Sequence, residues 1–296
     1  QIEGDHYLIE RLRMVGARNG VGSAAIRGHE CRAITIRDCV IADCDVGIDV
    51  LGDNLLIEDC DVGGCGTESV HGPSPSVRLT GGRATLRGNH VHDSVLGMLL
   101  KVSCRTFEAR ANRIIGGDDG EIGLADAGAD VDHRIAFIGN LVAGRTERSS
   151  NRIRFISVDV AKGAMRGTLE LVNNTFVAAD PGVIFLMNAD SALAVRVDNT
   201  IFAGSRQIAQ AGPDGITGRA NWTLPGANVP KGFSVGSSGD DAGFVDPASG
   251  DFRLRRDSPC RGRAMESLPV TRQPAVRPAT GSTPRRDARD LGAFAD

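Results

Sequence analysis

The chain of 296 residues has few aromatic side chains: one Trp, one Tyr and ten Phe, or 4% of the total. Its core must therefore rely on small and β-branched side chains. No apolar stretch approaches the length of about 18 residues that a membrane-spanning helix needs, so we predict no membrane span. The net charge of −3 argues against a nucleic-acid partner bound through a basic surface.

The sequence also lacks the short motifs of several enzyme classes. It contains no P-loop, no G-x-G-x-x-G after a strand, no H-E-x-x-H and no G-x-S-x-G. Nucleotide-binding, zincin and α/β-hydrolase functions are therefore excluded. Charged residues make up 24% of the chain and hydrophobic residues 41%, which is a composition typical of folded proteins.

An internal repeat runs through most of the chain. Phrases of alternating apolar and polar residues, such as ITIRDC at 34–39 and ATLRGN at 84–89, close on a Cys or an Asn. This period of two is typical of half-buried β-strands, and helical spacing is absent. The closing residues, at steps of 21, 29, 23, 28, 34 and 25, are Cys39, Cys60, Asn89, Asn112, Asn140, Asn174 and Asn199.

A turn residue that recurs in every unit indicates that equivalent positions stack. We therefore predict an all-β fold, a right-handed parallel β-helix, in which successive coils pair about 4.8 Å apart and stacked Asn side chains form a ladder. A β-sandwich or a different solenoid is the alternative. The repeat fades near residue 210, so we expect coils over 1–210 and an irregular C-terminal cap with an Arg- and Pro-rich tail over 211–296, packed on the solenoid.

The cysteines follow the same repeat. Cys39 and Cys44 recur 21 residues later as Cys60 and Cys65, so each pair would stack in neighbouring coils. Stacked positions are close enough for a disulfide. The chain has seven Cys, an odd number, and small buried thiols are the favoured interpretation, with a disulfide or metal role as the alternative.

In each repeat unit the turn residue is followed by a short strand, a loop and then a second strand. We expect this second strand to line a groove and to carry the candidate site residues. We expect such strands at ESVHGP (68–73), LGMLLK (96–101) and NRIRFI (151–156), among others. Their alternation predicts two outward rows offset by two residues, with His71 in the first and Lys101 in the second, on adjacent coils and within reach of one sugar. Glu121 begins the next coil. The residues of this candidate site are Arg27, Asp49, His71, Lys101, Glu121 and Arg154.

Two further groups could carry chemistry. Asp118 and Asp119, in the phrase GGDDGE with Glu121, could supply the paired carboxylates of a hydrolase, hold Ca²⁺, or simply form a turn. His90 and His92 in NHVHD point to one side of a strand and could bind a metal, although no third ligand is visible in the sequence.

The repeat phrases, the segment FVDPASGDFRLRRDSPCRGRA and the final RDLGAF resemble secreted bacterial proteins with the pectin-lyase-like fold. Members of that group are mainly polysaccharide lyases and glycoside hydrolases, with some binding or structural proteins. The resemblance implies a secreted or periplasmic location, and the loss of a signal peptide and a first coil before Gln1. We expect a monomer.

The resemblance implies a lyase that acts on an anionic, uronate-containing polysaccharide, and the scarcity of aromatic sugar platforms agrees with an anionic partner. Such a lyase needs a base that removes the proton α to the carboxylate and a positive group that holds the resulting charge. Lys101 in KVSC and His71 are the candidate acid–base groups, and Arg154 or a bound Ca²⁺ would neutralise the carboxylate. Asp49, Arg27 and Glu121 would bind substrate, and Asp118 and Asp119 would hold the metal.

Two other functions remain open at this point. One is a non-catalytic carbohydrate-binding or surface-structural β-helix. The other is a glycoside hydrolase that uses the acids around Asp119.

Overall fold

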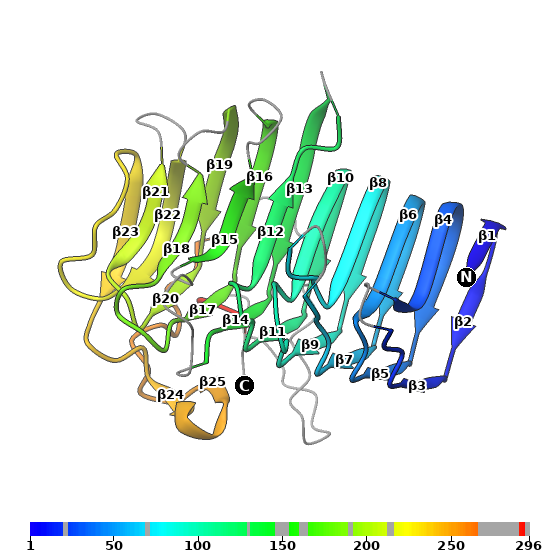
Figure 1. Ribbon diagram of the computed structural model, residues 1–296. Coiled ribbons are helices and arrows are strands. Elements are labelled where there is room, and N and C mark those ends of the chain that lie inside the picture. Colours follow the sequence, from blue (N-terminus) through cyan, green and yellow to red (C-terminus); the bar gives the residue numbers. More distant parts are fainter. Residues whose placement is uncertain are drawn as a thin grey trace.

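A computed structural model shows parallel β-strands that wind around one long axis as a right-handed β-helix (Figure 1). The structure describes residues 1–19, 23–68, 72–128, 131–145, 154–159, 165–188, 192–211, 216–265 and 290–293. Of the strands in these ranges, 23 form one parallel stack and two form a separate antiparallel pair. The predicted fold class is confirmed.

Each coil has three faces. The first and second sheets are continuous in the early coils, where one long strand bends from one face to the other, and they separate into paired strands later. The bent strands are β4 (Ala24–Arg37), β6 (Val46–Glu58), β8 (Val77–Arg87) and β10 (Leu100–Arg110). The later strands of the first sheet are β12 (Ile122–Ala125), β15 (Arg154–Asp159), β18 (Ile184–Asn188) and β21 (Gln207–Ala211), and those of the second are β13 (Asp132–Ile138), β16 (Arg166–Val172), β19 (Ala192–Asp198) and β22 (Ile216–Thr223).

The third sheet consists of three-residue strands along the lower edge of Figure 1. The first two strands, β1 (Ile2–Asp5) and β2 (Leu8–Glu10), both pair with the long strand β4. The strands of the third sheet are β3 (Arg13–Val15), β5 (Val40–Ala42), β7 (Asp61–Gly63), β9 (His90–His92), β11 (Arg113–Ile115), β14 (Leu141–Ala143), β17 (Thr175–Val177) and β20 (Ile201–Ala203).

The interior is filled by stacked aliphatic and thiol side chains in the early coils and by phenylalanines in the later ones. Phe176 and Phe202 lie on successive coils with parallel rings 5.3 Å apart, and Phe185 and Phe155 pack beside them. Most of the few aromatic residues are thus used inside the solenoid, and Trp222, fully buried, lies near its end.

The predicted asparagine ladder is present at the turn between the second and third sheets. The Nδ2 of Asn89 donates to Oδ1 of Asn112 at 3.0 Å, Asn112 donates to Asn140 at 2.9 Å, and Asn140 donates to Asn174 at 3.0 Å. The next position differs from the prediction, because Thr200 rather than Asn199 continues the ladder.

Asn199 has another task. It adopts the left-handed conformation, with φ of 54°, that the residue before each ladder position takes. Its Nδ2 donates to the carbonyl of Met265, and its Oδ1 accepts from the backbone amide of Met265, both at 2.9 Å. The amide therefore binds the C-terminal segment instead of the neighbouring coil.

The thiols lie where the stacking predicts. Cys60 continues the ladder toward the N-terminus, since its backbone amide donates to Oδ1 of Asn89 at 2.9 Å. All seven cysteines are free and buried, in agreement with a packing role.

The parallel pairing extends past residue 210, because β22 pairs with β19 and β23 (Phe233–Ser238) pairs with β22. The predicted boundary therefore falls inside the stack. Beyond it, β24 (Phe244–Asp246), a 3-10 turn η1 (Pro247–Ser249) and β25 (Asp251–Leu254) form a small cap. Within the described ranges, no helix is long and apolar enough to cross a membrane.

Candidate functional site

The outward face of the first sheet carries a row of charged side chains, which we call the charged row: Arg27, Asp49, Arg78 and Lys101. Strand pairing places these residues on four successive coils, with Arg27 opposite Asp49, Asp49 opposite Arg78, and Arg78 opposite Lys101. Neighbouring Cα atoms in such a row are about 4.8 Å apart. The row continues to Gly123, which carries no functional group.

Asp49 lies between two of the cations. Its Oδ2 is 3.5 Å from Nη2 of Arg27 and 3.4 Å from Nη1 of Arg78, and its side chain is only 19% exposed. Lys101 is exposed and makes no ion pair or hydrogen bond through its side chain with any residue that the structure describes. The row therefore carries two more positive than negative charges and ends in a cation available to a ligand.

The prediction placed Arg27 and Asp49 correctly on this face, and Lys101 lies in the same row rather than two residues further along. It missed Arg78. The loop between β7 and β8 is longer than the phrase ESVHGP suggested, so the strand begins at Val77 and Arg78 takes the position that was assigned to His71. His71 itself lies outside the described residues. The alternation in VRLT is the signal that could have located Arg78.

Arg154 and Glu121 are not in the charged row. Arg154 begins β15 three residues before Ser157, the residue that pairs with Gly123. The prediction started this strand three residues too early. Glu121 is fully buried, and its Oε2 accepts from the backbone amide of Gly117 at 2.7 Å, so it stabilises a turn instead of facing a ligand.

Two of the acids in the phrase GGDDGE are held by contacts within the protein. Asp118 is buried, and its Oδ1 is 3.2 Å from Nη2 of Arg145. A guanidinium thus occupies the place next to Asp118 that Ca²⁺ would need, while Asp119 is partly exposed and the carboxylate of Glu121 lies inside the turn. These residues do not fit Ca²⁺, and we derive no step that requires it.

Two hollows lie at the bend between the first and second sheets, and both are lined by Arg105 and Thr106. One, of about 470 Å³, also includes Asp53 and Arg83, and the other, of about 400 Å³, also includes Asp132 and Arg134. Neither hollow includes a residue of the charged row.

A separate group of side chains lies on the third sheet, where sequence reasoning found His90 and His92 but missed Asp61. Strand pairing places Asp61 opposite His90. The repeat itself contained this information, because the step of 29 residues from Cys60 to Asn89 also aligns Asp61 with His90. Burial, followed by the nearby His92, lowers the pKa of His90 below its ordinary value.

Comparisons with known proteins agree with the architecture. A crystal structure of pectate lyase Pel9A superposes with a TM-score of 0.55 at 12% sequence identity, covering 97% of this chain and 87% of that one. At this identity, the likeness concerns the fold alone. No curated protein matches.

The family model described as "Right handed beta helix region" matches residues 24–202, which is more than half of the chain and spans the coils from β4 to β20. By this match and by the strand pairing, the chain belongs to the right-handed β-helix family.

Proposed function

We propose that this chain binds a uronate-containing polysaccharide along the charged row and cleaves it by β-elimination at Lys101. The observation that carries the proposal is the direct pairing of Arg78 with Lys101 on one exposed sheet face. An amine and a guanidinium on adjacent coils are the two groups that this reaction requires, a base and a cation for the substrate carboxylate.

The reaction assigns a distinct role to each group. The guanidinium of Arg78, oriented by Asp49, binds the substrate carboxylate and stabilises the negative charge that develops when the α proton leaves. Lys101, in its neutral form, accepts that proton. The bond from the β carbon to the glycosidic oxygen then breaks, the leaving oxygen takes up a proton, and one product carries a carbon–carbon double bond conjugated to its carboxylate.

The surroundings of Lys101 support this assignment. Arg78 on the preceding coil would hold the substrate carboxylate beside the amine of Lys101. On the following coil, Gly123 has no side chain, and the sulfur of Met98 lies over it, within 2.6 Å of where a Cβ would be. An apolar surface beside the amine suits a sugar ring.

Binding without cleavage is the second candidate function. It is favoured by one observation: within the described residues, no acid or histidine lies next to Lys101 on the outward row to protonate the leaving group. For that role we propose His71, which lies seven positions before Arg78 in the sequence and outside the described residues. From the likeness to pectate lyase we also propose a secreted or periplasmic location.

The test uses a panel of uronate polymers, with and without Ca²⁺, and follows the ultraviolet absorbance of the unsaturated product. We expect the wild-type chain to produce this absorbance on at least one polymer. Lys101→Ala should lower the rate by about 10²- to 10⁴-fold, the range for loss of a general base, while polymer binding persists. Arg78→Ala should weaken both binding and rate, and His71→Ala should lower the rate.

Lys231→Ala is the matched control, because Lys231 is an exposed lysine in the loop between β22 and β23. It should leave both properties unchanged. Polymer binding without absorbance or new reducing ends would support the binding function, and reducing ends without absorbance would indicate hydrolysis. If the wild-type chain bound none of the polymers, both candidate functions would be wrong.

A further inference from the structure

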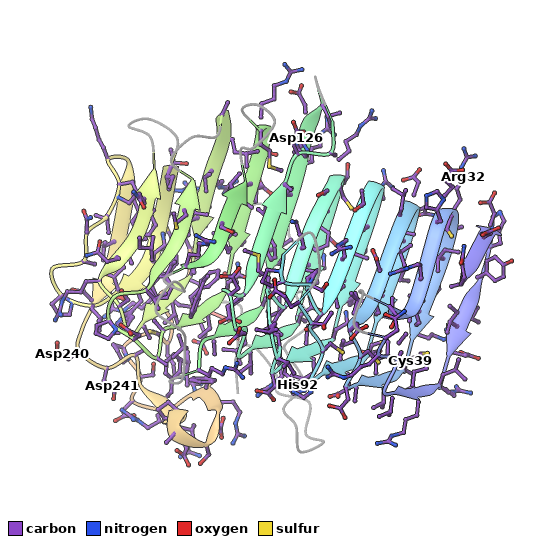
Figure 2. All side chains as sticks on the ribbon, in the orientation of Figure 1. Arg32, Cys39, His92, Asp126, Asp240 and Asp241 are labelled. Carbon is purple, nitrogen blue, oxygen red and sulfur yellow. The ribbon has the colours of Figure 1, made fainter. Side chains whose placement is uncertain are left out.

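Asp61, His90 and His92 form a compact group on the outward face of the third sheet, which we call the histidine cluster. Asp61 belongs to β7, and the two histidines begin and end β9 on either side of the buried Val91. Figure 2 shows His92 at the short-strand edge of the molecule, while Arg32, which marks the bend between the first and second sheets, lies at the opposite edge in this view. The cluster is therefore on a different face from the charged row.

The three side chains converge on one point. His90 Nδ1 is 3.1 Å from Asp61 Oδ2, and His92 Nε2 is 3.3 Å from Asp61 Oδ1. The two imidazole rings stack with centroids 4.1 Å apart, although residues two apart in a strand are separated by about 6.6 Å. Both rings therefore lean toward the carboxylate, and one ligand atom from each residue lies within 4.8 Å of the others.

Gly63 makes this convergence possible. It pairs with His92 across the strands, and a Cβ at Gly63 would lie 2.3 Å from Cε1 and 2.5 Å from Nε2 of that imidazole. The ring thus crosses the space that any other residue at position 63 would fill. The backbone at Gly63 is an ordinary strand, so the glycine is required for room and not for its dihedral angles.

His92 lies between two carboxylates. Its Nδ1 lies 2.8 Å from Oδ2 of Asp93, while its Nε2 faces Asp61. Asp93 at Nδ1 holds the ring so that Nε2 faces into the cluster, which is the arrangement by which a carboxylate orients a metal-binding histidine.

We propose that the histidine cluster is a binding site for Zn²⁺, with Nδ1 of His90, Nε2 of His92 and a carboxylate oxygen of Asp61 as its protein ligands. Two imidazoles and one carboxylate are a donor set of the borderline class that zinc prefers over the oxygen-only sets of Ca²⁺ and Mg²⁺. Tetrahedral zinc with bonds of about 2.1 Å holds its ligand atoms about 3.4 Å apart. Before any ion is added, each histidine nitrogen lies 3.1 or 3.3 Å from an oxygen of Asp61, and the three ligand atoms lie within 4.8 Å of one another.

The fourth position faces solvent, since all three side chains are partly exposed. Arg113 pairs with His90 on the next coil and is a positive charge that would repel a bound cation. Asp93, next to His92, adds a second negative charge that would attract it. The ion would link β7 to β9 and so connect two successive coils.

The experiment is isothermal titration calorimetry of the whole chain with Zn²⁺, followed by Co²⁺ as a spectroscopic probe. We expect one equivalent to bind, and Co²⁺ to give the intense visible bands of a four-coordinate site. His92→Ala and Asp61→Asn should abolish this binding. Gly63→Ala should weaken it by displacing the His92 ring, and Asp93→Asn should weaken it by about 10- to 100-fold, the range for loss of an orienting partner.

His29→Ala is the matched control, because His29 is an exposed histidine on the first sheet and should not affect binding. Circular dichroism of each variant shows whether it is folded. The proposal is overturned if the folded wild-type chain binds no Zn²⁺. It is also overturned if His92→Ala and Asp61→Asn bind as the wild type does, which would place the ion elsewhere, for example on a thiol. Polysaccharide binding is not needed for either outcome.

Discussion

Asn140 allows the ladder to be tested by one substitution. Its side chain is fully buried and makes four hydrogen bonds. Oδ1 accepts from both the backbone amide and the Nδ2 of Asn112, and Nδ2 donates to the carbonyl of Ala109 and to Oδ1 of Asn174. One side chain thus satisfies polar groups of the coils on both sides.

Asn140→Ala removes all four bonds and leaves their partners buried. A hydrogen bond contributes about 1 kcal/mol net, and a buried polar group without a partner costs about 1–3 kcal/mol. Since the small cavity could admit a water molecule that restores part of the bonding, we expect the free energy of unfolding to fall by about 3–4 kcal/mol. A loss of that size lies above the range of about 0.5–3 kcal/mol that most single substitutions cost.

Urea unfolding followed by far-ultraviolet circular dichroism measures this loss. Asn228→Ala is the matched control, because Asn228 is exposed and its side chain makes one long hydrogen bond of 3.4 Å to Gln207. The control should change stability by less than about 0.5 kcal/mol. If Asn140→Ala lost less than about 1 kcal/mol, the ladder would not be a main source of stability, and the reasoning from stacked asparagines would be wrong.

Two further predictions follow from the same interior. Thr200→Asn should raise the urea midpoint by an amount equivalent to about 1 kcal/mol. The amide oxygen of an Asn at this position could accept from Nδ2 of Asn174, which makes no hydrogen bond to Thr200. A lower midpoint would show that the position has no room for the larger side chain. Burial raises the pKa of Cys60, Cys65, Cys104 and Cys260 to about 12, so these thiols are protonated at pH 7. A thiol reagent should therefore label them only after unfolding. Rapid labelling of the native chain would contradict their burial.

The amino-acid sequence by itself determined the architecture. Period-two alternation fixes which side chains of a strand enter the core, and a turn that recurs every 21 to 34 residues forces those strands to stack. Both signals are local, so the ladder from Asn89 to Asn174 could be found without coordinates. The prediction chose Asn199 over Thr200 because both are polar and adjacent in the sequence. The contact between Asn199 and Met265, 66 residues away, decides which of the two faces the neighbouring coil.

The surface sites were decided by the tertiary structure. Whether Arg78 or His71 pairs with Lys101 depends on where the chain re-enters the first sheet before β8. Both ESVHGP and VRLT fit an alternating strand, and only the pairing between coils selects VRLT. Arg154 was misplaced for the same reason. The histidine cluster likewise needs β7 and β9 in register, with Gly63 under the His92 ring, before Asp61 becomes a third ligand. Hydrogen bonds between coils set this register, and they join residues that the chain separates by about thirty positions. The repeat can therefore align Asp61 with His90, while only the folded stack brings these two side chains and that of His92 together.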